Sequence, residues 1–519
     1  MMKFYYILIA LPVFLSSCKN FLEEDPESFV SEEQFYQTES DAETAINAVY
    51  YHLNTGSVQS PYNTLFNTGM NMADDDEDPG PGATNSDVRS LAVLSHTTSN
   101  QRVYELWQQH YAAIRKANVV LAKVPDISFS DETKKNRILG EAKFLRALFY
   151  FNLVRLFGDV PLITTYQSEV LASSYYTTRT ASDSVYAQIE TDLAEAATAL
   201  PASYTSPDVG RATAGAAKAL LAKVYLYEAS LPLKITSKYQ LAVSKAEEVL
   251  SAQDGGTGTY GYDLFTDYSH TFLPAYKNGV EHVFSAQMLA NSNNQDNNET
   301  QRAILSAIPG ITGNNYAHMV RYYTVGSDNY YSIYKIFRAD DKRRNVTFVR
   351  SFTSPTNGKK YGLPLSNPAV PNDSTPFYNK WWDPNYASAG ESSTNVTILR
   401  YSEVLLIHAE AENELNGPTA KAYKSINRVR TRAGLPDLTT GLSQDQFRDS
   451  VYLERRLELV YEYQRWFDLI REKNASGGGI LLSSLQKVGK TNVADKHYLY
   501  PIPQTEIDNN PLLTQNPGW

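Results

Sequence analysis

Apolar residues recur at helical spacing over much of the first half of this chain and again after residue 401, and that periodicity restricts the possible folds more than any other feature. One stripe, from Trp107 to Leu121, steps by four, three, four and three residues. The segment 141–157 is apolar on most sides, which predicts a buried helix that ends at Gly158. Further helices are predicted over 41–53, 183–200, 211–229, 239–250, 402–415, 419–433 and 444–473. The chain is therefore expected to be mainly α.

Two of these helices, 211–229 and 239–250, form a predicted helix-turn-helix pair. Small residues stand at the expected crossing, among them Ala222 and Ala246. The pair is similar to a tetratricopeptide unit, although its spacing is looser than the roughly 34-residue consensus. Each such pair leaves an apolar face uncovered, so pairs must stack on one another or dock on a larger body. We expect a scaffold of tetratricopeptide-like helix pairs.

Between residues 251 and 397 the helical pattern fades, and Gly, Asn, Ser, Pro and Tyr dominate. An irregular stretch of this length is uncommon inside a compact domain unless it builds a functional surface. Short strands are expected at 280–287 and 347–352. The predicted organisation is an N-terminal helical region (31–250) and a C-terminal region (251–519), the latter divided into a loop-rich ligand-binding segment (251–397) and closing helices (398–519).

The first 17 residues have the features of an export signal rather than of a folded element. Lys3 supplies a positive charge, and the apolar run 4–14 is too short to span a bilayer as a stable helix. The run leads into Leu15-Ser16-Ser17-Cys18, which resembles a bacterial lipobox, and Cys18 is the only cysteine. Residues 1–17 are predicted to be a lipoprotein signal peptide, Cys18 to carry the lipid, and residues 18–30 to form a polar tether. An ordinary signal peptide with an incidental cysteine is the alternative.

Composition narrows the choice of partner. The formal net charge of −10 disfavours nucleic acid. Tyr accounts for 37 of the 519 residues, and its apolar ring with a polar tip suits wet interfaces and ligand grooves.

Motifs for catalysis or metal binding are weak. The sequence contains neither a G-x-S-x-G nucleophile elbow nor an H-E-x-x-H zinc site. His408 and Glu412 have helical spacing but lack a third ligand nearby, so we expect them on a solvated helix face. The tripeptide Gly489-Lys490-Thr491 is expected in a surface loop. No cofactor and no enzymatic activity are predicted, and a glycoside hydrolase with paired carboxylates is the alternative.

Several separated blocks carry a family resemblance. They are Phe21-Leu22-Glu23-Glu24-Asp25-Pro26, Trp107 to Asn118, Glu141 to Pro161, Gly210 to Thr213, Arg400 to Ala411, Ile426 to Leu435, Glu454 to Leu459, Arg465 to Arg471 and Pro501 to Gly518. In these blocks, and in their order, the sequence resembles the SusD/RagB family, surface lipoproteins that capture nutrients beside a TonB-dependent porin in Bacteroidetes.

The resemblance implies both a fold and a role. The fold would be a SusD-like α/α superhelix of tetratricopeptide-like helix pairs with an irregular ligand-binding region built on it. The role would be non-catalytic: the protein would sit on the outer membrane through its lipid, face the exterior, capture oligosaccharide and pass it to a SusC-like TonB-dependent transporter. Peptide or another nutrient as the ligand stays open.

The first candidate ligand segment is the acidic run Asp74-Asp75-Asp76-Glu77-Asp78, in a Gly-Pro-rich loop between two predicted helices. Carboxylates accept bidentate hydrogen bonds from hydroxyl groups, and the resemblance implies that this inter-helix region contributes to the ligand site. An EF-hand is excluded, because Pro79 stands where the calcium loop needs Gly and Asn85 where it needs Glu. Looser calcium binding is left open.

The second candidate ligand segment is 316–334, which is rich in Tyr with Asn, Asp and Arg interleaved. The resemblance implies ligand-contacting aromatics just before an Asp-x-Arg element, which Asp341-Lys342-Arg343 matches. Some of these tyrosines are expected to pack against the scaffold instead. The predicted ligand-binding residues are Asp74, Asp75, Asp76, Arg89, Arg321, Tyr322, Tyr323, Asn329, Tyr330, Tyr331 and Trp382.

Other matching residues are expected to be structural. A charge network between helices is predicted for Glu454, Arg455, Glu458 and Arg465, because Arg and Glu brace helices without doing chemistry. Trp466, Phe467 and Trp381 are expected to pack in the interior.

Overall fold

The computed structural model describes residues 35–54, 59–80, 82–166, 176–289, 318–321, 323–325, 329–354, 356–362, 376–381 and 392–519. The predicted signal peptide, Cys18 and the tether therefore lie outside the described residues. Within the described ranges, no helix is both long and apolar enough to cross a membrane.

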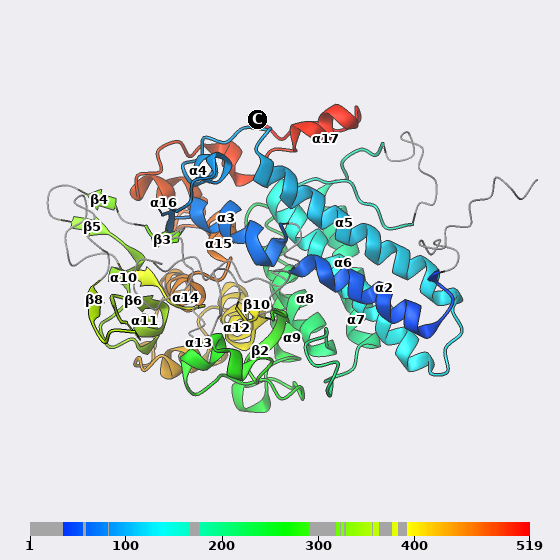
Figure 1. The fold of residues 1–519 in the computed structure, drawn as a ribbon. Helices are drawn as coiled ribbons and strands as arrows, with labels where there is room; N and C mark the ends of the chain where they lie inside the picture. The colour runs from blue at the N-terminus through cyan, green and yellow to red at the C-terminus, as the bar shows by residue number, and fades with distance from the viewer. Residues whose placement is uncertain are drawn as a thin grey trace, which may run out of the picture.

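Among the described residues, nine helices carry most of the scaffold. They are α2 (Glu39–Tyr50), α5 (Gln101–Lys123), α6 (Glu132–Phe157), α7 (Ser182–Ala199), α8 (Ala214–Ala229), α9 (Lys238–Glu247), α12 (Tyr401–Asn416), α13 (Ala420–Arg432) and α14 (Gln444–Leu459). Figure 1 shows them as a continuous body in which α2 packs on α5, each of α5 to α9 packs on the next helix, α9 packs on α12, and α12 packs on α13 and α14. This arrangement confirms the mainly α prediction and the scaffold of paired helices.

Local sequence explains the two central helices. The carboxylate of Asp131 caps α6 by accepting a hydrogen bond from the amide of Thr133 at 2.8 Å. Gly158 ends the helix with φ +71°, a conformation that costs glycine little. Along α8 the alanines, such as Ala217 and Ala222, are fully buried, so neighbouring backbones approach closely.

In the part of the chain that the structure describes, short strands form five antiparallel pairs. They are β1 (Glu77–Pro79) with β3 (His318–Val320), β2 (His282–Ala286) with β10 (Val396–Arg400), β4 (Tyr323–Val325) with β5 (Asn329–Tyr331), β6 (Phe348–Val349) with β9 (Phe377–Tyr378), and β7 (Ser351–Thr353) with β8 (Lys360–Gly362). The other α-helices within the described ranges are α3 (Phe66–Gly69), α4 (Ser86–Ala92), α10 (Ile333–Ile336), α11 (Lys342–Thr347), α15 (Arg465–Arg471), α16 (Leu481–Lys487) and α17 (Gln504–Asn509). In Figure 1, β3 to β6 and β8 gather at one end of the molecule, away from α5 to α7. The strands expected at 280–287 and 347–352 are confirmed as β2 and as β6 with β7.

The single helix predicted over 444–473 is wrong, because the chain turns between α14 and α15. Tyr461 and Tyr463 adopt φ +64° and +61°, which is unusual for bulky residues. Packing holds this corner: the ring of Tyr461 stacks on Tyr378 with centroids 4.2 Å apart, and its carbonyl accepts a hydrogen bond from Trp381 Nε1 at 2.9 Å. The prediction that Trp381 packs in the interior is confirmed, since its side chain is 1% exposed.

The solvated face predicted for His408 and Glu412 is also wrong. Both are buried, because α12 packs against α8, α9, α13 and α14. His408 Nδ1 lies 2.8 Å from Ser425 Oγ, and Glu412 accepts a hydrogen bond from the hydroxyl of Thr419 at 2.8 Å. These side chains brace the helix from within.

The surface loop predicted for Gly489-Lys490-Thr491 is wrong at its centre. Lys490 is buried, and its ammonium donates to the carbonyls of Met72 at 2.7 Å and Glu77 at 3.1 Å. It fixes the chain after α16 to the segment that leads into β1.

Candidate functional site

The two predicted ligand segments meet in the fold. Strand β1 comes from the acidic run and pairs with β3 from the tyrosine-rich segment, Glu77 opposite Val320 and Pro79 opposite His318. Beyond the ladder, the amide of Arg321 donates to the carbonyl of Asp76 at 2.7 Å. Segments about 240 positions apart in sequence thus form one two-stranded edge, next to which Figure 1 places the β4–β5 hairpin.

The carboxylates of the acidic run, however, are turned inward. Asp75 is 2% exposed. Its carboxylate accepts two hydrogen bonds from Arg465, one from Nε at 2.7 Å and one from Nη2 at 2.9 Å. Asp76 accepts a hydrogen bond from Arg456 Nε at 3.1 Å. Asp74 is buried too, and its carboxylate accepts hydrogen bonds from the backbone amides of residues 76 and 77. Arginines of α14 and α15 thus draw the carboxylates of Asp75 and Asp76 into the interior, and a role of Asp74, Asp75 and Asp76 in ligand binding stays a prediction.

Burial and neighbouring charge act in opposite directions on these acids. For Asp75, burial raises the pKa, but the guanidinium groups of Arg456 and Arg465 outweigh burial and hold the pKa below its ordinary value. For Asp74, burial and the adjacent carboxylates of Asp76 and Asp75 raise the pKa well above its ordinary value. The run is therefore an anchor that combines an ion-paired carboxylate, Asp75, with a carboxyl group of raised pKa, Asp74, rather than a row of equivalent free anions.

Arginines from the predicted set join the same framework. Arg321 Nη1 forms an ion pair with Asp78 Oδ2 at 2.6 Å, and its Nε donates to the carbonyl of Val488 at 3.0 Å. Arg89, on α4, is exposed and donates to the carbonyl of Gly80 at 3.1 Å. The side chain of Arg321 thus helps to hold β3 against β1, whereas the side chain of Arg89 is exposed to solvent.

The predicted tyrosines fall on the hairpin. The register of β4 and β5 sets Tyr323 opposite Tyr331 and Thr324 opposite Tyr330, and β5 begins at Asn329. Tyr322 and Trp382 lie outside the described residues. A role in ligand binding for these residues stays a prediction.

The charge network predicted between helices is present and buried, and it also fixes the loop-rich region to the closing helices. Glu458 of α14 accepts a hydrogen bond from Arg343 at 3.0 Å and pairs with Arg400 and Arg432. Arg343 also forms a bidentate pair with Asp341, at 3.0 Å and 2.8 Å, within the Asp-x-Arg element that follows the hairpin. The hairpin therefore leads directly into a rigid, internally neutralised support.

Glu454 and Arg455, which were also predicted to belong to the charge network, form ion pairs with residues of other helices. Glu454 pairs with Arg430 at 2.9 Å, and Arg455 pairs with Glu403 at 2.7 Å. Trp466 and Phe467 are buried, as expected. These side chains hold the closing helices together.

No metal centre is evident: among the described residues, no group of three or more His, Cys, Asp or Glu side chains could hold an ion.

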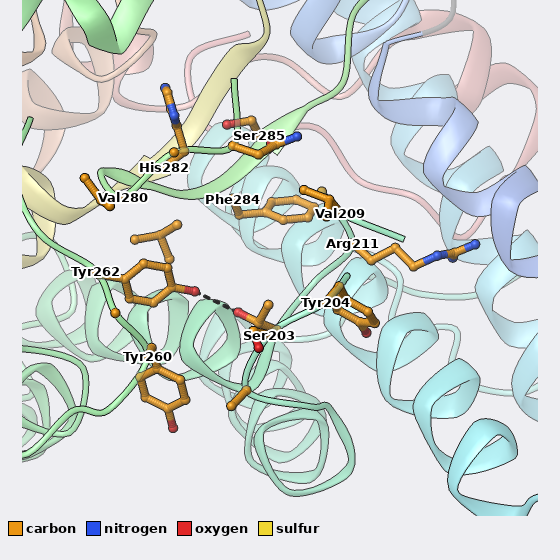
Figure 2. Close-up of a pocket in the computed structure, with 17 residues that line it drawn as sticks. Ser203, Tyr204, Val209, Arg211, Tyr260, Tyr262, Val280, His282, Phe284 and Ser285 are labelled. Atoms are coloured by element: carbon orange, nitrogen blue, oxygen red, sulfur yellow. Dashed lines mark hydrogen bonds between the residues drawn. The ribbon is translucent and has the colours of Figure 1, made fainter. Parts of the chain in front are cut away.

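Sequence reasoning missed one pocket of about 300 Å³, shown in Figure 2. Tyr204, Tyr260 and Tyr262 line it together with β2 and the chain before it. A cluster of Gly and Tyr at 255–262 was the available signal, but the walls come from three separate segments, so no local pattern joins them.

Comparison with known proteins gives consistent matches over nearly the whole chain. Residues 247–519 match the model of the "SusD family", and residues 20–226 match a model described as "Starch-binding associating with outer membrane". SusD-like protein P25 of Formosa agariphila is 28% identical over 98% of this chain and 97% of its own.

Two solved structures extend the match to the fold. A SusD homolog from Bacteroides thetaiotaomicron has a TM-score of 0.77 at 26% identity, covering 94% of this chain and 99% of its own. A laminarin binding SusD-like protein has a TM-score of 0.74 at 26% identity, covering 93% of this chain and 100% of its own.

Proposed function

Since this chain belongs to the SusD family, we propose that it is a non-catalytic lipoprotein of the cell surface that captures oligosaccharide and delivers it to a SusC-like TonB-dependent transporter in the outer membrane. The observation that carries the proposal is the likeness, over nearly the full chain, to a SusD-like protein that binds laminarin. The family model named for starch binding and outer-membrane association supports the same class of ligand and the same location.

The arrangement of the site fits capture rather than chemistry. The Asp341-Lys342-Arg343 element is fixed to α14 by buried ion pairs, and Asp76, just before β1, pairs with Arg456 of the same helix, which gives the adjoining loops a rigid base. Aromatic rings cover the C–H face of a sugar while their polar tips meet hydroxyl groups, so we assign ligand contact to tyrosines of the hairpin. Cys18 supplies the lipid anchor, and residues 18–30 a tether that lets the binding face move relative to the transporter.

Isothermal titration against a glycan panel tests this proposal. The panel includes laminarihexaose and maltohexaose, and the variants are Tyr322→Ala, Tyr323→Ala, Tyr330→Ala and Tyr331→Ala. We expect at least one hairpin variant to bind the glycan several-fold more weakly than wild type. Tyr176→Ala is a matched control, because Tyr176 is 39% exposed on the segment between α6 and α7. Unchanged affinity in all four variants would refute the site, and binding of casein-type peptides with no glycan response would refute the ligand class.

A further inference from the structure

The pocket of Figure 2 lies between the chain before α8, residues 260–262 and β2. In Figure 1, α8 and β2 are well separated from the β4–β5 hairpin, to which ligand contact is assigned above. The pocket volume of about 300 Å³ is at the small end of the range for ligand sites. It is therefore a separate concavity of a size that suits a short piece of ligand.

Its aromatic wall is Tyr260 with Tyr262. Their ring centroids lie 5.9 Å apart and the ring planes are inclined by 31°. Both rings rest on Gly215 in the first turn of α8, where a Cβ atom would come within 2.7 Å of Tyr262 and 2.8 Å of Tyr260. The hydroxyl of Tyr262 lies 2.8 Å from that of Thr213, the N-cap of the same helix. Glycine and the helix cap thus hold two partly exposed aromatic rings in fixed positions.

The charge of the pocket is already neutralised. Among the described lining residues, Arg211 is the one permanently charged side chain, and it pairs with Glu141 at 2.9 Å and Asp208 at 2.8 Å. Burial lowers the pKa of His282, which keeps its ring neutral at pH 7. The remaining polar groups are hydroxyls and amides, such as Ser203 and Asn278. A neutral, hydroxyl-bearing ligand suits this lining better than an ion.

The rim adds exposed aliphatic surface. Val209 is 46% exposed and Val280 is 45% exposed, and both line the pocket. Apolar side chains beside rigid tyrosines form the kind of surface that covers the C–H face of a sugar ring, while hydroxyl and amide groups meet the ring edge.

We propose that this pocket is a second carbohydrate-binding site, which takes a short segment of a neutral glycan whose principal contact lies at the β4–β5 hairpin. The inference rests on the proposed function. Two weak sites on one long chain raise affinity through effective concentration, whereas a short oligosaccharide that occupies only one of the sites gains nothing. The pocket therefore favours retention of polymer over short fragments.

The test compares polymer with hexasaccharide, using laminarin with laminarihexaose and amylopectin with maltohexaose. Tyr260→Ala removes one wall. Val280→Arg fills the mouth from an exposed position and keeps the core intact, so the test does not depend on one variant folding. We expect both variants to bind the polymer about fivefold more weakly, as for loss of one aromatic contact, while hexasaccharide affinity stays at the wild-type value. Leu241→Arg is the matched control, since Leu241 is 42% exposed on α9.

Unchanged polymer affinity in both pocket variants, with wild type binding glycan, would overturn the second site and leave the proposed function standing. An equal loss for polymer and hexasaccharide would overturn it as well, because the pocket would then be part of the principal site. If wild type binds neither polymer, both the second site and glucan capture fail, which is a distinguishable result.

Discussion

Replacing Asp75 by Asn should show how strongly the buried anchor holds the loop-rich region. In the wild type, Asp75 is 2% exposed and receives two hydrogen bonds from Arg465, at 2.7 Å and 2.9 Å, and an ion pair from Arg456 Nη2 at 2.9 Å. The amide of Asn keeps the shape but removes the charge, so the guanidinium of Arg465 stays buried with its main counter-ion gone.

Removing one partner of a buried ion pair typically costs about 3–5 kcal/mol, because the remaining charge is desolvated without compensation. Folded proteins have a total stability of about 5–15 kcal/mol, so the loss would be a large fraction of it. Asp340→Asn is the matched control: Asp340 makes a bidentate pair with Arg338 at 2.9 Å and 2.7 Å, but both side chains are more than half exposed. That substitution should leave stability unchanged, because exposed pairs contribute little.

The assay is urea unfolding followed by tryptophan fluorescence, at several pH values. The two arginines hold the pKa of Asp75 below its ordinary value. The carboxylate therefore stabilises the fold at pH values above the pKa of the unfolded state, about 4, and this stabilisation is lost as the pH falls below it. The difference between Asp75→Asn and wild type should therefore be full at pH 7 and shrink below about pH 4. Equal unfolding midpoints for variant and wild type at pH 7 would refute the anchoring role.

Three further predictions concern stability. Gly215→Ala should destabilise the protein by about 1–3 kcal/mol in urea unfolding, because the added methyl group overpacks against Tyr260 and Tyr262; a neutral result would mean that these rings move freely. Burial, and after it the charge of Asp468, raises the pKa of Glu472 from 4.5 to about 8. Between these pH values the folded state binds a proton that the unfolded state has lost, so the stability of the wild type should fall as the pH rises through this window. Glu472→Gln should remove that dependence in melting curves at pH 5 and pH 8.5, and parallel curves for the two proteins would contradict it. Trp381→Ala should lower stability by about 3–5 kcal/mol, because it opens a cavity beside the Tyr461 corner, and calorimetry showing a loss below about 1 kcal/mol would argue against that packing role.

Features set by local sequence were predictable. The helical stripe and Gly158 locate the C-terminal part of α6, because periodicity and end signals act within a few residues, whereas the helix begins at Glu132, before the predicted start at 141. The charge network was predictable in its members, such as Glu454 and Glu458, but not in its pairing, since most partners come from other elements.

The errors share one physical cause, which is contact between distant segments. No residue near Asp75 in the sequence indicates that its carboxylate will be buried against Arg465, which lies 390 positions away. His408 has the spacing of a surface pair, yet four helices enclose α12. The Tyr260–Tyr262 pocket was missed for the same reason, because the two rings pack on Gly215 of α8, which is distant in sequence.

Affinity electrophoresis in native gels that contain a single polysaccharide tests the central proposal most directly. The lipid-free mature protein is run in gels with laminarin, amylopectin or no polysaccharide, with bovine serum albumin as the non-binding standard. Capture of glycan predicts that at least one polysaccharide retards the protein relative to the empty gel and that the hairpin variants Tyr330→Ala and Tyr331→Ala migrate faster in that gel. Wild-type mobility that is the same in every gel would contradict the proposal.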